Sequence, residues 1–116
     1  SVALRRLATR ILLAAGEVDR AEALWRSNTK RASLDAVMSW IEVARIRERH
    51  RGDLQGALEA VEAGSRVLDL AFALGRGGGM LSIGKARLRI DARRRRLRRW
   101  VAAAERRRER ERRRVA

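Results

Sequence analysis

Apolar residues in the first part of the chain recur at intervals of three and four, which is the spacing of one face of an α-helix. The stretch LRRLATRILLAA, for example, places Leu4, Leu7 and Ile11 on one side. The pattern predicts four helices, at about residues 3–15, 19–30, 34–50 and 54–74. Alternating β-branched runs are missing and the chain has no proline, so the predicted fold class is all-α.

Two stretches, GEVDRAEALW from Gly16 and GDLQGALEAV from Gly52, follow the same order of residue types. Glycine ends a helix in the left-handed conformation at little cost, and a small alanine lets the preceding helix pass closely. A large apolar residue then fills the space where the two helices diverge. Each stretch therefore predicts the turn and second helix of an antiparallel helical hairpin. The residues that we expect to have these structural roles are Gly16, Ala21, Trp25, Gly52, Ala57 and Val61.

Short polar residues mark the expected helix starts. Asp19, with Glu22 three positions later, predicts a capping box. Ser33 is the expected N-cap of a helix that begins at Leu34. Asp53 is the expected cap of the fourth helix, so the sequence Arg-Gly-Asp at 51–53 is explained by the turn rather than by an adhesion function.

A helix–turn–helix unit of about 34 residues with these features resembles the tetratricopeptide repeat. The resemblance lies in LATRILLAAGEVDRAEALW and in VARIRERHRGDLQGALEAV. It implies two hairpins, over about 3–30 and 34–74, in a right-handed stack that spans residues 1–74 and holds a protein partner on its concave side. Both copies lack the closing proline, and the aromatic residue usual in the first helix is Leu12 in one copy. A generic helical bundle is the alternative.

The stretch EVARIRERHRGDLQGALEAVEAGSRVL resembles the C-terminal repeat region of a bacterial protein family with an N-terminal ribonuclease-H-like exonuclease domain. Glu48, His50, Arg51 and Asp53 stand where that family has a Glu/His/Arg cluster before the turn. The resemblance implies that the chain is a non-catalytic interaction or scaffold module beside a nuclease domain. The catalytic carboxylates of the family belong to that domain, so the resemblance assigns no catalytic residue to this chain.

The net charge of +15 is concentrated after residue 74. We expect a glycine-rich linker at 75–80, followed by a basic amphipathic helix at 81–104 that caps the last hairpin. The segment 105–116, rich in arginine and glutamate, is expected to be frayed or disordered.

Guanidinium groups suit phosphate oxygens, so the basic helix is also a candidate site for nucleic acid. The candidate contacts are Arg93, Arg94, Arg95, Arg96, Arg98 and Arg99. Only Trp100 could stack on a base near them, so binding would be non-specific. A small nucleic-acid-binding protein is therefore the alternative to the interaction module. The arginine excess is also what the codon bias of a GC-rich genome would produce.

Few residues could carry catalysis or bind a metal ion. Cysteine is absent and His50 is the only histidine, so a zinc site has too few ligands. The stretch GMLSIGKA approaches a phosphate-binding loop but has Ala86 where the loop needs a hydroxyl, and a flexible linker explains it better. We therefore expect no catalytic residue, no metal and no cofactor.

The sequence also bears on the localisation of the protein. The first residues carry arginines without an acid, as in a targeting peptide, but their apolar stripe favours a repeat helix. No apolar run approaches the roughly 18 residues that cross a membrane, so we expect a cytoplasmic protein without a membrane partner.

Two repeats bury little apolar surface, so the outer face of the first helix should be apolar and open. The chain should then be a fragment beside an adjoining domain, bind a protein partner, or form a homo-oligomer.

Overall fold

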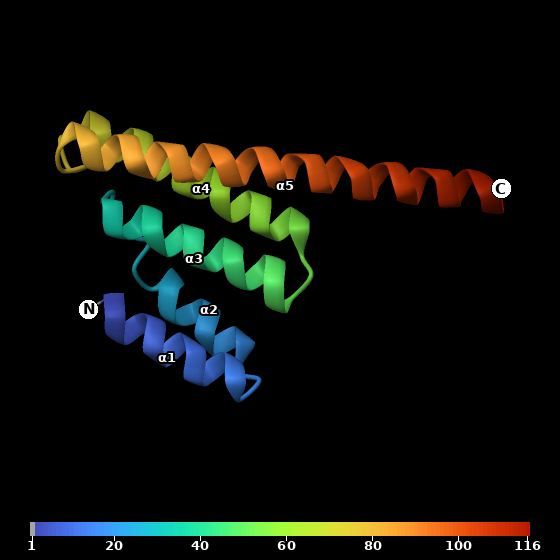
Figure 1. Cartoon of the computed structure of the whole chain (residues 1–116), viewed down its shortest axis with the longest axis horizontal. Coiled ribbons are helices and arrows are strands. Elements are labelled where there is room, and N and C mark those ends of the chain that lie inside the picture. Colours follow the sequence, from blue (N-terminus) through green and yellow to red (C-terminus); the bar gives the residue numbers. More distant parts are fainter. Residues whose placement is uncertain (1) are drawn as a thin grey trace.

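The computed structural model describes residues 2–116, which form five α-helices that pack side by side (Figure 1). The helices are α1 (Val2–Ala14), α2 (Val18–Arg26), α3 (Leu34–His50), α4 (Leu54–Ala73) and α5 (Met80–Val115). No strand occurs in this range, so the all-α prediction is confirmed. Each helix contacts the next one along the chain, and α5 also contacts α3. That these helices form a right-handed tetratricopeptide-type stack stays a prediction.

The core is built around α3, which is covered by α2, α4 and α5. Buried residues lie on several faces of this helix, among them Val37, Ile41 and Ile46. Helices α2, α4 and α5, in contrast, each bury residues along one side, as amphipathic helices do. Four of the residues with expected structural roles belong to this core, each at most 1% exposed: Ala21, Trp25, Ala57 and Val61. The two alanines are therefore fully buried, and the expectation that each lets a neighbouring helix pass closely stays a prediction.

The outer face of α1 is apolar and exposed. Leu4, Leu7 and Ile11 are each between 47% and 67% exposed, and Thr9, on the opposite side, is the only buried residue of the helix. The expectation of an open apolar face on the first helix is thus confirmed. The backbone of α1 lies close to that of α2 alone, and α1 reaches α3 through the Arg5 side chain, which binds Asp35 at 3.1 Å, so α1 forms one edge of the described molecule.

Two glycines form the turns at the ends of α1 and α3. Gly16 has φ +77° and Gly52 has φ +61°, which is the left-handed region that glycine adopts without a Cβ clash. At the first turn the Gly16 N–H donates to the Leu13 carbonyl and the Glu17 N–H to the Leu12 carbonyl, at 3.1 and 2.8 Å. These bonds satisfy carbonyls that a helix end leaves unpaired.

We expect Gly16→Ala to lower the free energy of unfolding by about 1–2 kcal/mol, the cost of the left-handed conformation for an L-residue. A Cβ at this position meets no atom within 4 Å, so the loss comes from the backbone alone. Urea unfolding followed by circular dichroism measures it. Gly84→Ala is the matched control: it lies in open space within α5 and should stabilise by about 0.5–1 kcal/mol. A loss at both positions would contradict this explanation.

The start of α2 differs from the prediction. The helix begins at Val18 with Glu17 at the N-cap, and no side chain caps it, so the capping box of Asp19 and Glu22 is wrong. Both carboxylates bind arginines of the α3 region instead: Asp19 Oδ1 accepts from Arg51 at 2.6 Å. A charge-assisted bond to arginine is stronger than a neutral one, and it draws these side chains away from the helix end.

Helix α2 also ends earlier than expected, at Arg26 instead of residue 30. Ser27 Oγ donates to the Leu24 carbonyl at 2.8 Å, and Thr29 Oγ1 donates to the Arg26 carbonyl at 2.7 Å. Short polar side chains compete with the helix for its backbone groups in this way. The caps predicted at the next two helices are confirmed, because Ser33 Oγ accepts from the Ala36 N–H and Asp53 Oδ1 from the Gly56 N–H.

Helix α5 is longer than predicted. It has 36 residues, and at 1.5 Å per residue it runs about 54 Å, projecting beyond the other helices at its C-terminal end (Figure 1). The segment 105–116 is therefore helical through Val115, beyond the predicted end of the helix at residue 104, while the fraying of this end stays a prediction. Glu109 accepts from Arg112 and from Arg113, three and four positions later, a spacing that supports a solvated helix. Despite this length, none of the helices described is apolar enough to cross a membrane.

Candidate functional site

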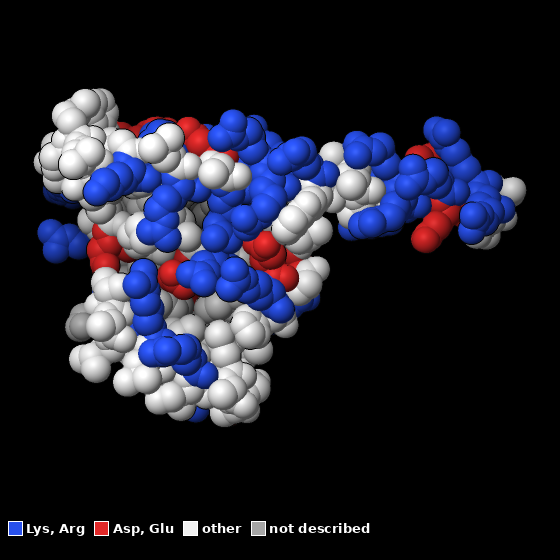
Figure 2. All heavy atoms as spheres, in the orientation of Figure 1, with Lys and Arg blue, Asp and Glu red and all other residues white. Residues whose placement is uncertain are grey.

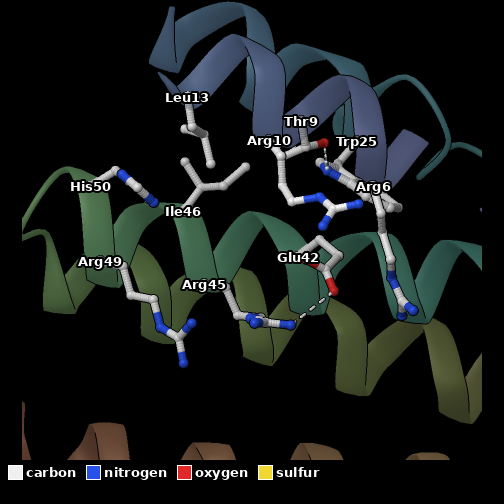
Figure 3. Close-up of a pocket in the computed structure, with 10 residues that line it drawn as sticks. All are labelled: Arg6, Thr9, Arg10, Leu13, Trp25, Glu42, Arg45, Ile46, Arg49 and His50. Carbon is white, nitrogen blue, oxygen red and sulfur yellow. Dashed lines mark hydrogen bonds and ion pairs between the residues drawn. The ribbon is translucent and has the colours of Figure 1, made fainter. Parts of the chain in front are cut away.

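A groove lies between α1 and α3 and encloses about 450 Å³ (Figure 3). Helix α2 packs against both helices, whereas within residues 2–116 the backbones of α1 and α3 do not touch each other. The groove is therefore a consequence of the helix order: α2 joins two walls and leaves the space between them open. Its volume falls in the range of about 300–1,000 Å³ that is typical of ligand pockets.

The lining of the groove is strongly basic. Arg6 and Arg10 come from α1, and Arg45 and Arg49 come from α3, while Glu42 is its only carboxylate. The Arg45 guanidinium donates to Glu42 at 3.4 Å. In the part of the chain that the structure describes, the other three arginines form no ion pair. The groove thus holds more cations than its one acid can neutralise.

An apolar floor accompanies these charges. Leu13 and Ile46 point toward each other across the groove, and the ring of His50 lies beside them (Figure 3). Trp25 forms part of the wall but is 1% exposed. Its indole N–H donates to Thr9 Oγ1 at 2.7 Å, and the Arg5 guanidinium lies 5.3 Å from the ring centroid. The indole is therefore fixed by its neighbours and offers no open face to a ligand.

Ion pairs fix the position of α2 relative to α3, and both helices contribute to the lining of the groove. Glu22 accepts from Arg47 Nε at 3.0 Å and from Arg51 Nε at 3.3 Å. Arg47 also donates to the Gly56 carbonyl at 2.9 Å, so this one arginine of α3 links α2 and the start of α4. Burial alone would raise the pKa of Glu22, but the hydrogen bond and charge of Arg47, with those of Arg51, outweigh it and lower the pKa from its ordinary 4.5.

This lowered pKa makes the stability of the fold depend on pH. The unfolded chain takes up the Glu22 proton first as pH falls, so the contribution of Glu22 is complete above the unfolded pKa and is lost as pH falls through the lower folded value. We expect Glu22→Gln to destabilise by about 1–2 kcal/mol at neutral pH. Urea unfolding of both proteins between about pH 7 and pH 2.5 measures the difference, which should vanish at the acidic end. A difference independent of pH would exclude the ionised carboxylate as its origin.

The six arginines predicted to bind nucleic acid divide into two groups. Four dock α5 onto the other helices, because Glu48 of α3 binds Arg93 and Arg96, and Glu62 of α4 binds Arg94 and Arg98. Arg95 and Arg99 are exposed, and neither forms an ion pair with any residue of the described range. Their role in binding nucleic acid stays a prediction, but most of the set has a structural partner already.

Glu48 is surrounded by cations. Its carboxylate oxygens lie 3.3 Å from Arg93 and 3.2 Å from Arg96, and its side chain is only 12% exposed. Burial and the charge of Arg96 lower the pKa of Arg93 more than Glu48 raises it, and Arg45 and Arg49 of the groove lower it further. These cations belong to a band of basic side chains that crosses α1, α3 and α5 on one face of the molecule (Figure 2).

Sequence reasoning missed the groove. Its signal is a pair of arginines four positions apart in each of two helices, Arg6 with Arg10 and Arg45 with Arg49, a spacing that puts both members on one helical face. His50, considered above only as a lone metal ligand and through the family resemblance, lies at the end of this groove. Glu48, noted only through the family resemblance, fixes α5 to α3.

Among residues 2–116, no three histidine, aspartate or glutamate side chains come together in a way that could hold a metal ion. The expected turn glycines, Gly16 and Gly52, lie at helix ends outside the groove. Comparisons of the chain with models of protein families, with curated proteins and with solved structures find no match.

Proposed function

We propose that the chain is a non-catalytic interaction module of the tetratricopeptide type, which holds an acidic segment of a protein partner in the groove between α1 and α3. One observation carries the proposal: three arginines without an ion pair and one paired arginine surround an apolar floor in an open cavity. Carboxylates of the partner would bind Arg10 and Arg49, and an apolar side chain would rest against Leu13, because Ile46 is only 3% exposed.

The chemistry of the lining favours binding over catalysis. Arginine is not deprotonated in proteins, and the one carboxylate, Glu42, is 8% exposed and already bound to Arg45. A charged lining with a small apolar centre gives orientation and selectivity to a bound segment. The same features suit an adjoining domain of the same polypeptide, such as the nuclease that the family resemblance implies.

A direct test uses a fluorescein-labelled peptide of about twelve residues that contains glutamates and one central leucine. The groove variant Arg10→Glu/Arg49→Glu should bind it at least about tenfold more weakly, because like charges then face each other. The control Arg20→Glu/Arg66→Glu changes the net charge equally at exposed positions outside the groove and should keep most of the affinity. Fluorescence anisotropy measures both.

Two outcomes would contradict the proposal. Equal losses in the two variants would show that the peptide responds to total charge and not to the groove. Equal binding of a peptide with glutamine in place of glutamate would show that the arginines of the groove do not select acids. Circular dichroism of each variant establishes that the helices remain folded.

A further inference from the structure

A row of arginines runs along the solvent-facing side of α5, and we propose that it binds the phosphate backbone of a double-helical nucleic acid. The row consists of Arg95, Arg99, Arg106, Arg110 and Arg114. At 3.6 residues per turn these five lie within about 100° of arc and extend over about 28 Å of helix. Arg113 falls within the same arc, but it is paired with Glu109 and is not counted in the row. The inference is independent of the groove and concerns a different surface.

The packing of α5 determines which arginines form this row. Ile90 and Leu97 are fully buried against the other helices, and the arginines on their flanks bind Glu48 and Glu62. The five arginines of the row fall on the opposite side of the helix and are all exposed. Within the described chain none of them forms an ion pair. The acids of the molecule therefore neutralise the inner side of α5 and leave the outer side charged.

The row continues beyond the body of the molecule. The C-terminal end of α5 projects past the other helices (Figures 1 and 2), so the last members of the row can reach a large ligand without steric conflict. The surface of double-stranded DNA carries one negative charge per about 1.7 Å of its axis. A straight row of cations about 28 Å long can therefore meet phosphates along its whole length.

Other anionic partners fit this surface less well. A membrane-binding helix needs an apolar face, and between Ala104 and Val115 the sequence holds only arginine and glutamate. Single strands bind through stacking on aromatic side chains, but Trp100 lies outside the row and Arg96 covers its ring at 5.2 Å. An acidic peptide would gain only exposed ion pairs from this row, which contribute little each, and no apolar contact. The phosphates of a duplex need only cations in a line.

The test is the salt dependence of binding to a fluorescein-labelled DNA duplex of about 20 base pairs. Five neutralised phosphates predict a slope of log K against log salt near −4.5, which weakens binding about 500-fold between 50 and 200 mM salt. The variant Arg106→Gln/Arg110→Gln/Arg114→Gln retains two members, so its slope should fall to about −1.8. The same range of salt should then weaken its binding only about twelvefold.

The matched control Arg107→Gln/Arg108→Gln/Arg112→Gln removes the same charge from the same segment but outside the row. Its slope of log K against log salt should differ from that of the unchanged protein by no more than about 0.9, the change that the loss of one phosphate contact produces. Equal changes in both variants would overturn the proposal in favour of bulk charge. Tighter binding to a single strand of the same length, or to vesicles rich in phosphatidylserine, would overturn the assignment to a duplex. Circular dichroism of both variants checks that α5 stays helical.

Discussion

Trp25→Ala should lower the free energy of unfolding by about 3–5 kcal/mol, the range for removing a large aromatic side chain from a core. Trp25 is 1% exposed, and it lies in α2, the helix that joins both walls of the groove. A chain of this size is stable by about 5–15 kcal/mol, so the substitution should remove a large share of that stability. Urea unfolding at neutral pH, followed by circular dichroism, measures the loss.

The control for this substitution is Trp100→Ala. Trp100 is 43% exposed and contacts Arg96 through its ring at 5.2 Å, so its loss should cost only about 1–2 kcal/mol. The groove gives a second readout, because the acidic peptide should also lose affinity when the wall behind Thr9 is removed. If both tryptophan variants unfolded at the same urea concentration, Trp25 would not be the residue that fixes α2 between α1 and α3.

The helices of the chain could be predicted from local signals. Apolar spacing, the two turn glycines and the caps Ser33 and Asp53 all act within one or two helical turns, and the structure agrees with each of them. The bounds of α3 match the prediction to the residue. Such features depend on residues a few positions apart, so they can be identified in a single amino-acid sequence.

Pairings between distant residues could not be predicted in the same way. Asp19 has the local features of an N-cap, yet it binds Arg51, thirty-two positions away. Arg93 belongs to a run that resembles a nucleic-acid site, yet it binds Glu48, forty-five positions away. The groove has the same origin, since its two arginine pairs come from helices that only the fold brings together. The capping box of Asp19 was wrong because a long-range ion pair replaced the role that the local sequence suggested.

The second large effect concerns the junction of α3 and α5. We expect Glu48→Gln to lower the free energy of unfolding by about 2–3 kcal/mol, less than for a fully buried pair because Arg96 is 40% exposed. The substitution leaves Arg93 and Arg96 close together without their shared acid. Arg93 is the critical member, since its side chain is only 16% exposed. The control Glu109→Gln breaks ion pairs on the projecting end of α5 and should cost under about 0.5 kcal/mol.

Repulsion between arginines, rather than loss of packing, should account for most of this cost, and two measurements separate the causes. Screening is strong at 1 M salt, where the Debye length is about 3 Å, so added salt should reduce the difference between Glu48→Gln and the unchanged protein. Replacing Arg93 as well, in Glu48→Gln/Arg93→Gln, removes the uncompensated charge and should restore at least half of the lost stability. A loss that neither salt nor the second substitution relieves would point to packing instead. In that case the arginines of α5 would act as spacers between helices, and the carboxylate of Glu48 would not be the group that attaches α5 to α3.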